Sequence, residues 1–169
     1  MSGAGNPKQL YYAIFNNAQY YSKGAQLLSE NVFQGRKDGS YIAPAMLCNT
    51  FCLELLLKCL QIINEDEVFT KADLETKGIR LNEHRYSAIF DKIEGSVQND
   101  ILKTFNSLFQ QQLTKDDYIQ RLRQIGDNSF VEWRYVYEST QEKRMDVHLQ
   151  NQIMDSLGKT IEQCLKRKK

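Results

Sequence analysis

The sequence contains few residues that interrupt helices. Proline occurs only at Pro7 and Pro44, and there are 9 glycines among 169 residues. Because these two residue types are the least compatible with a helix interior, their scarcity favours long uninterrupted helices. We therefore predict an all-α protein.

The sequence also lacks an excess of charge of one sign and a long apolar run. No segment has the roughly eighteen uninterrupted apolar residues that span a bilayer, and "MSGAGNPKQ" does not follow a signal-peptide pattern. The formal net charge is +1, so nucleic-acid binding would need a local basic patch. We expect a cytoplasmic protein that does not bind membranes, with a single domain over 1–169, a flexible lead-in at 1–8 and a solvated basic tail at 166–169.

Several motifs of known chemistry are missing. There is no glycine-rich phosphate loop and no nucleophile elbow. Cys48, Cys52, Cys59 and Cys164 lack the tight paired spacings of a structural zinc site. Free cysteine is among the most buried residue types. We interpret the four cysteines as reduced core thiols and predict neither a metal nor a cofactor.

Apolar residues recur at three- and four-residue steps in several segments, which is typical of amphipathic helices. The predicted helices are 8–31, 42–63, a helix capped by Asn82 through "EHRYSAIFDKIE", one capped by Ser96, one after Thr114, and one from near Asp146 to the end. The helix at 42–63 is apolar nearly all round, with a narrow polar strip of Glu54, Lys58 and Gln61. Such a helix belongs in the centre of a bundle.

The stretch "NSFVEWRYVYES" at 128–139 holds the only tryptophan, Trp133, and lies in a predicted irregular region before the last helix. Together with Arg134, Tyr135 and Tyr137, it suits two roles. Aromatic faces and guanidinium planes stack on bases, and the same groups also pack stably at a corner between helices.

The chain has two histidines, which are the natural candidates for acid–base chemistry. His84 stands beside Arg85 at a predicted helix start. His148 falls on the polar face of the last predicted helix. Each also has a structural interpretation, as a capping or surface residue.

Three motifs in a fixed order, "FCLELLLKCLQ", "EHRYSAIFDKI" and "FVEWRYVYES", resemble the HEPN superfamily over roughly residues 10 to 165. The resemblance implies a compact up-and-down bundle of about five helices. It also implies a homodimer that contacts RNA, a nucleotide or a partner protein, as in bacterial defence or toxin–antitoxin systems. Many members are metal-independent endoribonucleases, which use an arginine and a histidine a few residues apart near the last helix.

The sequence departs from that ribonuclease pattern. The positions where the histidine would follow Arg134 hold Ser139, Thr140 and Gln141, and none of these side chains is a general base near neutral pH. Arg144 and His148 form the nearest pair, but only three residues separate them.

The helix-start motif of the family, Gly-His-Asp-Leu, is also altered. His84 is retained, whereas Glu83 and Arg85 occupy the glycine and aspartate positions.

The resulting prediction is a HEPN-like binding or interaction module that lacks the ribonuclease pair, and the sequence leaves open whether it has enzymatic activity. The predicted binding residues are Arg134, Trp133, Tyr135, Tyr137, His84 and Arg85. One alternative is a divergent metal-independent endoribonuclease that uses Arg134 with His84 or His148. Another is a purely structural scaffold in which the aromatic stretch only packs.

Overall fold

The computed structural model describes residues 9–33, 40–135 and 146–168. Over these residues the chain forms helices and no strand, which confirms the all-α prediction. The longer helices are α1 (Leu10–Phe33), α2 (Ile42–Gln61), α5 (Gly95–Phe109), α6 (Lys115–Gln124) and α8 (Val147–Arg167). The short ones are α3 (Lys71–Thr76), α4 (Tyr86–Asp91) and α7 (Ser129–Arg134). The three short helices raise the number above the five expected.

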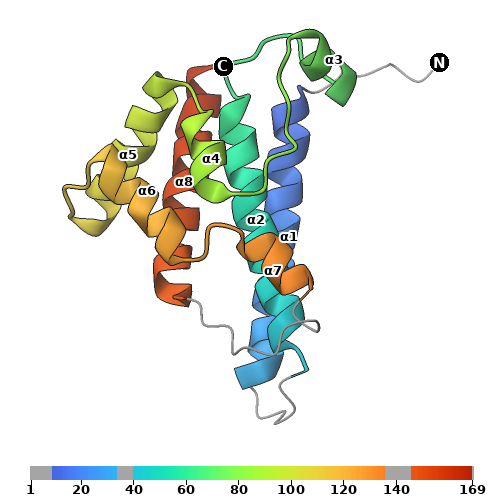
Figure 1. Cartoon of the computed structure of the whole chain (residues 1–169), viewed down its shortest axis with the longest axis vertical. Helices are drawn as coiled ribbons and strands as arrows, with labels where there is room; N and C mark the ends of the chain where they lie inside the picture. The colour runs from blue at the N-terminus through green and yellow to red at the C-terminus, as the bar shows by residue number, and fades with distance from the viewer. Residues whose placement is uncertain (1–8, 34–39, 136–145, 169) are drawn as a thin grey trace.

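Helix α2 is the central element, as its all-round apolarity predicts. It packs against α1, α4, α7 and α8. Figure 1 shows α1 and α8 on either side of it, with α4 and α7 across the front. By length and composition alone α2 could also cross a membrane, and half of its most apolar window is buried against the rest of the protein. Core helices of soluble proteins share these properties.

Small residues on α1 allow a close approach to α2. Ala18 and Ala25 are buried, and a Cβ at Gly24 would lie 3.8 Å from Sγ of Cys48. Cys59 packs in the same layer and its thiol donates to the backbone oxygen of Tyr11. This α1–α2 pair forms the most extensive helix contact among the described residues.

Several predicted helix ends are confirmed. Thr114 and Asp117 form a capping box, in which each side chain accepts a hydrogen bond from the other residue's backbone N–H. Asp146 caps α8 by accepting from the N–H of Leu149 at 2.9 Å. Gly126 follows α6 with a φ of 90°, a backbone conformation that glycine adopts without strain.

Two predicted starts are wrong. Asn82 caps no helix, because residues 83–85 precede α4 and Arg85 is extended. The first turn of α4 is held instead by Asp127, whose carboxylate accepts from the backbone N–H of Ser87 at 2.6 Å. Ser96 does not cap α5 either, since it lies inside the first turn and donates to the Glu94 carboxylate.

The stretch 128–135, predicted to be irregular, is also different in the structure. Residues Ser129–Arg134 form α7. The hydroxyl of Ser129 donates to the backbone oxygens of Ile125 and Gly126, which anchors this short helix to the end of α6. The aromatic stretch therefore begins on a helix that packs against α2.

Candidate functional site

The side chain of His84 lies beside the buried carboxylate of Glu54. His84 precedes α4, and Glu54 lies near the middle of α2. Nδ1 of His84 is 3.1 Å and 3.2 Å from the two carboxylate oxygens. The Glu54 side chain is 1% exposed, whereas that of His84 is 46% exposed. A buried charge thus holds a histidine that reaches the surface.

Lys58 binds the same carboxylate from one turn further along α2. Its Nζ is 2.6 Å from Oε1 of Glu54, and its side chain is only 10% exposed. A buried carboxylate is stable only when its charge is compensated, and here Lys58 and the imidazole both contribute. The charge of Glu54 also acts on Tyr86. The pKa of Tyr86 is raised well above its ordinary value, mainly by burial and secondly by the charge of Glu54.

The contact with Glu54 fixes which nitrogen of His84 carries a proton. An ionised carboxylate only accepts hydrogen bonds, so Nδ1 must be the donor. In the neutral ring Nε2 is then the free acceptor. Nε2 has no hydrogen-bond partner in the part of the chain that the structure describes. The ring can therefore accept a proton or a hydrogen bond from a ligand, or pair with an anion when it is protonated.

Three aromatic rings lie in contact with one another, and the last of them is close to His84. Tyr21 of α1 meets Phe51 of α2 edge to face at 4.6 Å, and Phe51 stacks on Phe130 of α7 at 4.6 Å. The Phe130 ring lies 6.0 Å from that of His84. We call Tyr21, Phe51 and Phe130 the aromatic row. None of the three is among the binding residues predicted from the sequence, although Phe51 and Phe130 belong to the quoted motifs.

Helix α7 also carries two of the predicted binding residues. Arg134 is exposed and lies four residues after Phe130, so the two share one face of α7. Its guanidinium lies 5.4 Å from the ring centre of Tyr135. Trp133 is half-buried. The predicted residue Tyr137 lies outside the described residues.

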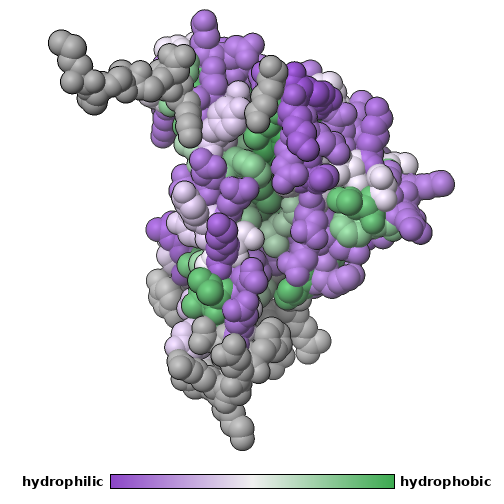
Figure 2. All heavy atoms as spheres, turned by 180° about the vertical axis from the view of Figure 1, so that it is seen from behind, coloured by the Kyte–Doolittle hydropathy of each residue, from purple (hydrophilic) through white to green (hydrophobic). Residues whose placement is uncertain are grey.

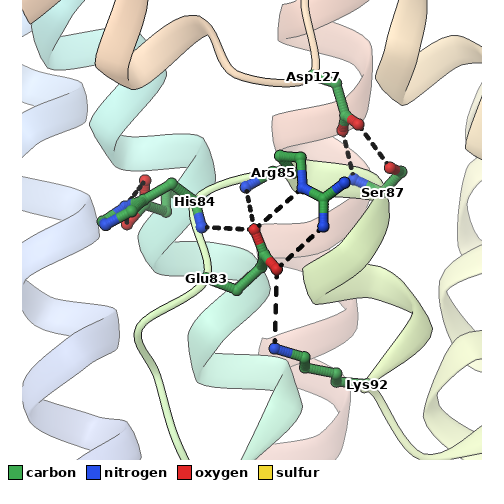
Figure 3. Close-up of polar contacts among 7 residues, drawn as sticks. Glu83, His84, Arg85, Ser87, Lys92 and Asp127 are labelled. Atoms are coloured by element: carbon green, nitrogen blue, oxygen red, sulfur yellow. Dashed lines mark hydrogen bonds and ion pairs between the residues drawn. The ribbon is translucent and has the colours of Figure 1, made fainter.

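The structure separates His84 from Arg85. In Figure 3 the imidazole points to α2, and the guanidinium of Arg85 points the other way, onto Glu83. Nε of Arg85 is 3.3 Å from the Glu83 carboxylate, which also lies 3.9 Å from Nζ of Lys92. Side-chain and backbone hydrogen bonds from Arg85 are the main cause that lowers the pKa of Glu83 to about 2. Arg85 is thus held in an ion pair.

Asp127 positions α7 next to the His84 connection. Its two carboxylate oxygens accept from the N–H and the hydroxyl of Ser87, each at 2.6 Å, and its backbone oxygen accepts from the N–H of Tyr86. Figure 3 shows Asp127 reaching from the connection after α6 to the start of α4. An aspartate in a loop gives no sequence signal for this role.

The other predicted catalytic candidate is not brought to this place by any described contact. His148 is exposed on the first turn of α8. Ser139, Thr140, Gln141 and Arg144 lie outside the described residues, so the ribonuclease spacing is not visible in the structure. No group of three or more histidine, cysteine or acidic residues is arranged for a metal in the described parts of the chain.

The cysteines are placed as core residues. Cys52, Cys59 and Cys164 are buried, and Cys48 is half-buried. Burial raises the pKa of Cys52 to about 12, which makes this thiol a poor nucleophile.

Comparisons with known proteins give no relative: no family model, no curated protein and no solved structure matches the chain.

Proposed function

We propose that the chain is a HEPN-like module that binds RNA at the His84 site, by which we mean His84 with Glu54, Lys58 and Phe130. The single observation that carries this proposal is the buried Glu54 carboxylate holding a half-exposed imidazole. Burying a charge is costly, and the role that we assign to this buried carboxylate is to orient His84. The outer nitrogen of that imidazole is suited to a phosphate or a ribose hydroxyl.

The surroundings of His84 favour a nucleic acid as the ligand. Phe130 and Tyr21 belong to the aromatic row, and unpaired bases stack on such rings. Arg134, one turn from Phe130, supplies a cation for a phosphate. Because the net charge of the protein is only +1, binding would depend on these local groups.

To test the proposal, the protein is titrated into a labelled single-stranded RNA of mixed sequence at two salt concentrations. Binding is measured by fluorescence polarisation. We expect His84→Ala and Arg134→Ala each to weaken binding about tenfold, equivalent to about 1.4 kcal/mol. His148→Ala is the matched control, because it removes the other histidine from an exposed helix face. Binding should also weaken with salt if phosphates are contacted. Equal affinity in wild type and His84→Ala would reject the proposal.

A divergent endoribonuclease is the second candidate, favoured by the same hydrogen bond between Glu54 and Nδ1 of His84. A histidine oriented by a carboxylate can act as a general base. The ribose 2′-oxygen would attack the adjacent phosphorus while its proton passes to Nε2. The bond from phosphorus to the 5′-oxygen would break, and that oxygen would take a proton from solvent.

Incubation of RNA with the protein in a metal chelator distinguishes the two functions. Fragments ending in a 2′,3′-cyclic phosphate that disappear with His84→Ala would establish the enzyme. Intact RNA with retained affinity supports the binding module. If RNA neither binds nor breaks, both RNA functions are rejected and the purely structural scaffold is favoured for this site.

A further inference from the structure

The face of the bundle opposite α4 and α7 carries a long open groove. It runs between α1 and α8, with Asn49, Cys52 and Leu56 of α2 at its floor. We call it the α1–α8 groove. Figure 2, which views the molecule from behind, shows a hydrophobic strip over the middle of this face between hydrophilic flanks. The groove encloses about 970 Å³.

The groove has about the length of a four-turn helix. Its α1 wall extends from Phe15 to Ser29 and its α8 wall from Val147 to Glu162. At a rise of about 1.5 Å per residue, each wall is about 20 Å long, or four helical turns. The floor between these walls is shorter, because Asn49, Cys52 and Leu56 span about two turns of α2. An elongated groove with a central apolar part suits a rod-shaped occupant, as in helix-in-groove recognition.

The α8 wall leaves room for a close approach. A Cβ at Gly158 would meet no heavy atom within 4 Å, so this position opens directly into the groove. Met154 beside it is flexible enough to fit different side chains. Leu108 and Val147 line the groove and are 46% and 43% exposed. Large exposed apolar side chains at a groove favour a protein partner.

The charged residues of the groove indicate which charge its occupant should carry. Lys159 and Glu162 pair with each other at 3.6 Å. Asp155, which also lines the groove, has no hydrogen bond or ion pair within the described parts of the chain. Partial burial raises the pKa of the Asp155 carboxyl. Among the described residues, the Asp155 carboxylate in the groove therefore has no counter-charge.

We propose that the α1–α8 groove docks an amphipathic helix of a partner protein, with its apolar stripe on Leu108, Val147 and Met154 and a lysine or arginine paired with Asp155. The surface is distinct from the His84 site, which lies on the α4 and α7 side of α2. The inference is therefore independent of RNA binding and needs no RNA in its test.

The test uses a displayed peptide library selected against the full chain. Each peptide is about fourteen residues long, the length of the groove, with apolar residues at helical spacing and randomised polar positions. We expect enrichment of peptides that carry a lysine or arginine at one fixed position. Their affinity should fall at least about tenfold with Gly158→Phe, whose ring would fill the groove, and stay unchanged with Gly158→Ala.

A charge exchange tests the contact with Asp155. Asp155→Lys should reject the enriched basic peptide, and changing that basic residue of the peptide to glutamate should restore binding to Asp155→Lys. Circular dichroism checks that each variant is folded.

The proposal is overturned if no peptide is enriched, or if enriched peptides bind Gly158→Phe as well as wild type. It is also overturned if sedimentation shows a dimer of this chain that Gly158→Phe dissociates, since the occupant would then be a second copy.

Discussion

Both carboxylate oxygens of Glu54 lie within hydrogen-bonding distance of one nitrogen of His84, at 3.1 Å and 3.2 Å from Nδ1. The same carboxylate is bound by Lys58 inside the core. A half-exposed histidine is thus held by a charge on the central helix, so that the orientation of the site and the stability of the fold depend on one residue.

Glu54→Leu should lower the free energy of unfolding by about 3–5 kcal/mol, because it leaves Lys58 buried without its counter-charge. Urea denaturation measures the change. The double variant Glu54→Leu with Lys58→Met is the control and should recover most of the stability, since a buried ion pair can be replaced by packed apolar side chains. A loss below about 1 kcal/mol in the single variant would show that solvent reaches Lys58.

The Glu83 carboxyl should titrate far below its ordinary pKa of 4.5, at about 2, because Arg85 donates hydrogen bonds to its ionised form. A lowered pKa in the folded state means that Glu83 contributes stability above pH 4.5. That contribution should disappear as the pH falls toward 2. NMR of the carboxyl carbon measures the midpoint, and Arg85→Met should raise it. A midpoint near 4.5 in the wild type would contradict the ion pair.

Two glycines should respond to alanine in opposite directions. At Gly126 φ is 90° and a Cβ would clash with Oγ of Ser129, so Gly126→Ala should destabilise by about 1–2 kcal/mol. Gly158 lies within α8 with open space around it, so Gly158→Ala should stabilise by about 0.5–1 kcal/mol. Thermal denaturation of both variants, side by side with wild type, checks the signs. The same sign at both sites would be inconsistent with these backbone conformations.

Trp133 should matter less to stability than a fully buried aromatic residue. Phe90 is completely buried, and Phe90→Ala should cost about 3–5 kcal/mol. Trp133 is half-buried, so Trp133→Ala should cost clearly less. Tyr20→Ala is the control, because this side chain is 66% exposed. Its free energy of unfolding should stay within about 0.5 kcal/mol of wild type. Equal losses at Trp133 and Phe90 would favour the scaffold interpretation of the aromatic stretch.

Helix periodicity was sufficient to predict the central position of α2, because a helix that is apolar on almost every side has to be covered. It was not sufficient for the polar strip of that helix. Glu54 and Lys58 would be solvated on an isolated amphipathic helix, yet they are buried. The segment before α4 lies over Glu54, and it comes from 30 residues further along the chain. Local patterns do not contain such a contact.

The residues of the candidate site could be predicted only in part, because its contacts join segments that are distant in the sequence. His84 could be selected because histidine is uncommon and stood in a motif, whereas its partner Glu54 looked like an ordinary surface residue. Asp127 was missed because a loop aspartate has many uses, and only the folded chain places it at the start of α4. The start assigned to Asn82 was wrong because this distant carboxylate takes the capping role at α4.

The coverage of α2 on several sides has a consequence for hydrogen exchange. Backbone amides in its middle, around Leu53 and Leu57, are fully buried and can exchange with solvent only when the whole bundle opens. Short α3 on the periphery can open alone. Glu54 therefore belongs to the part of the molecule that opens most slowly, whereas its partner His84 lies in a connection that can open sooner.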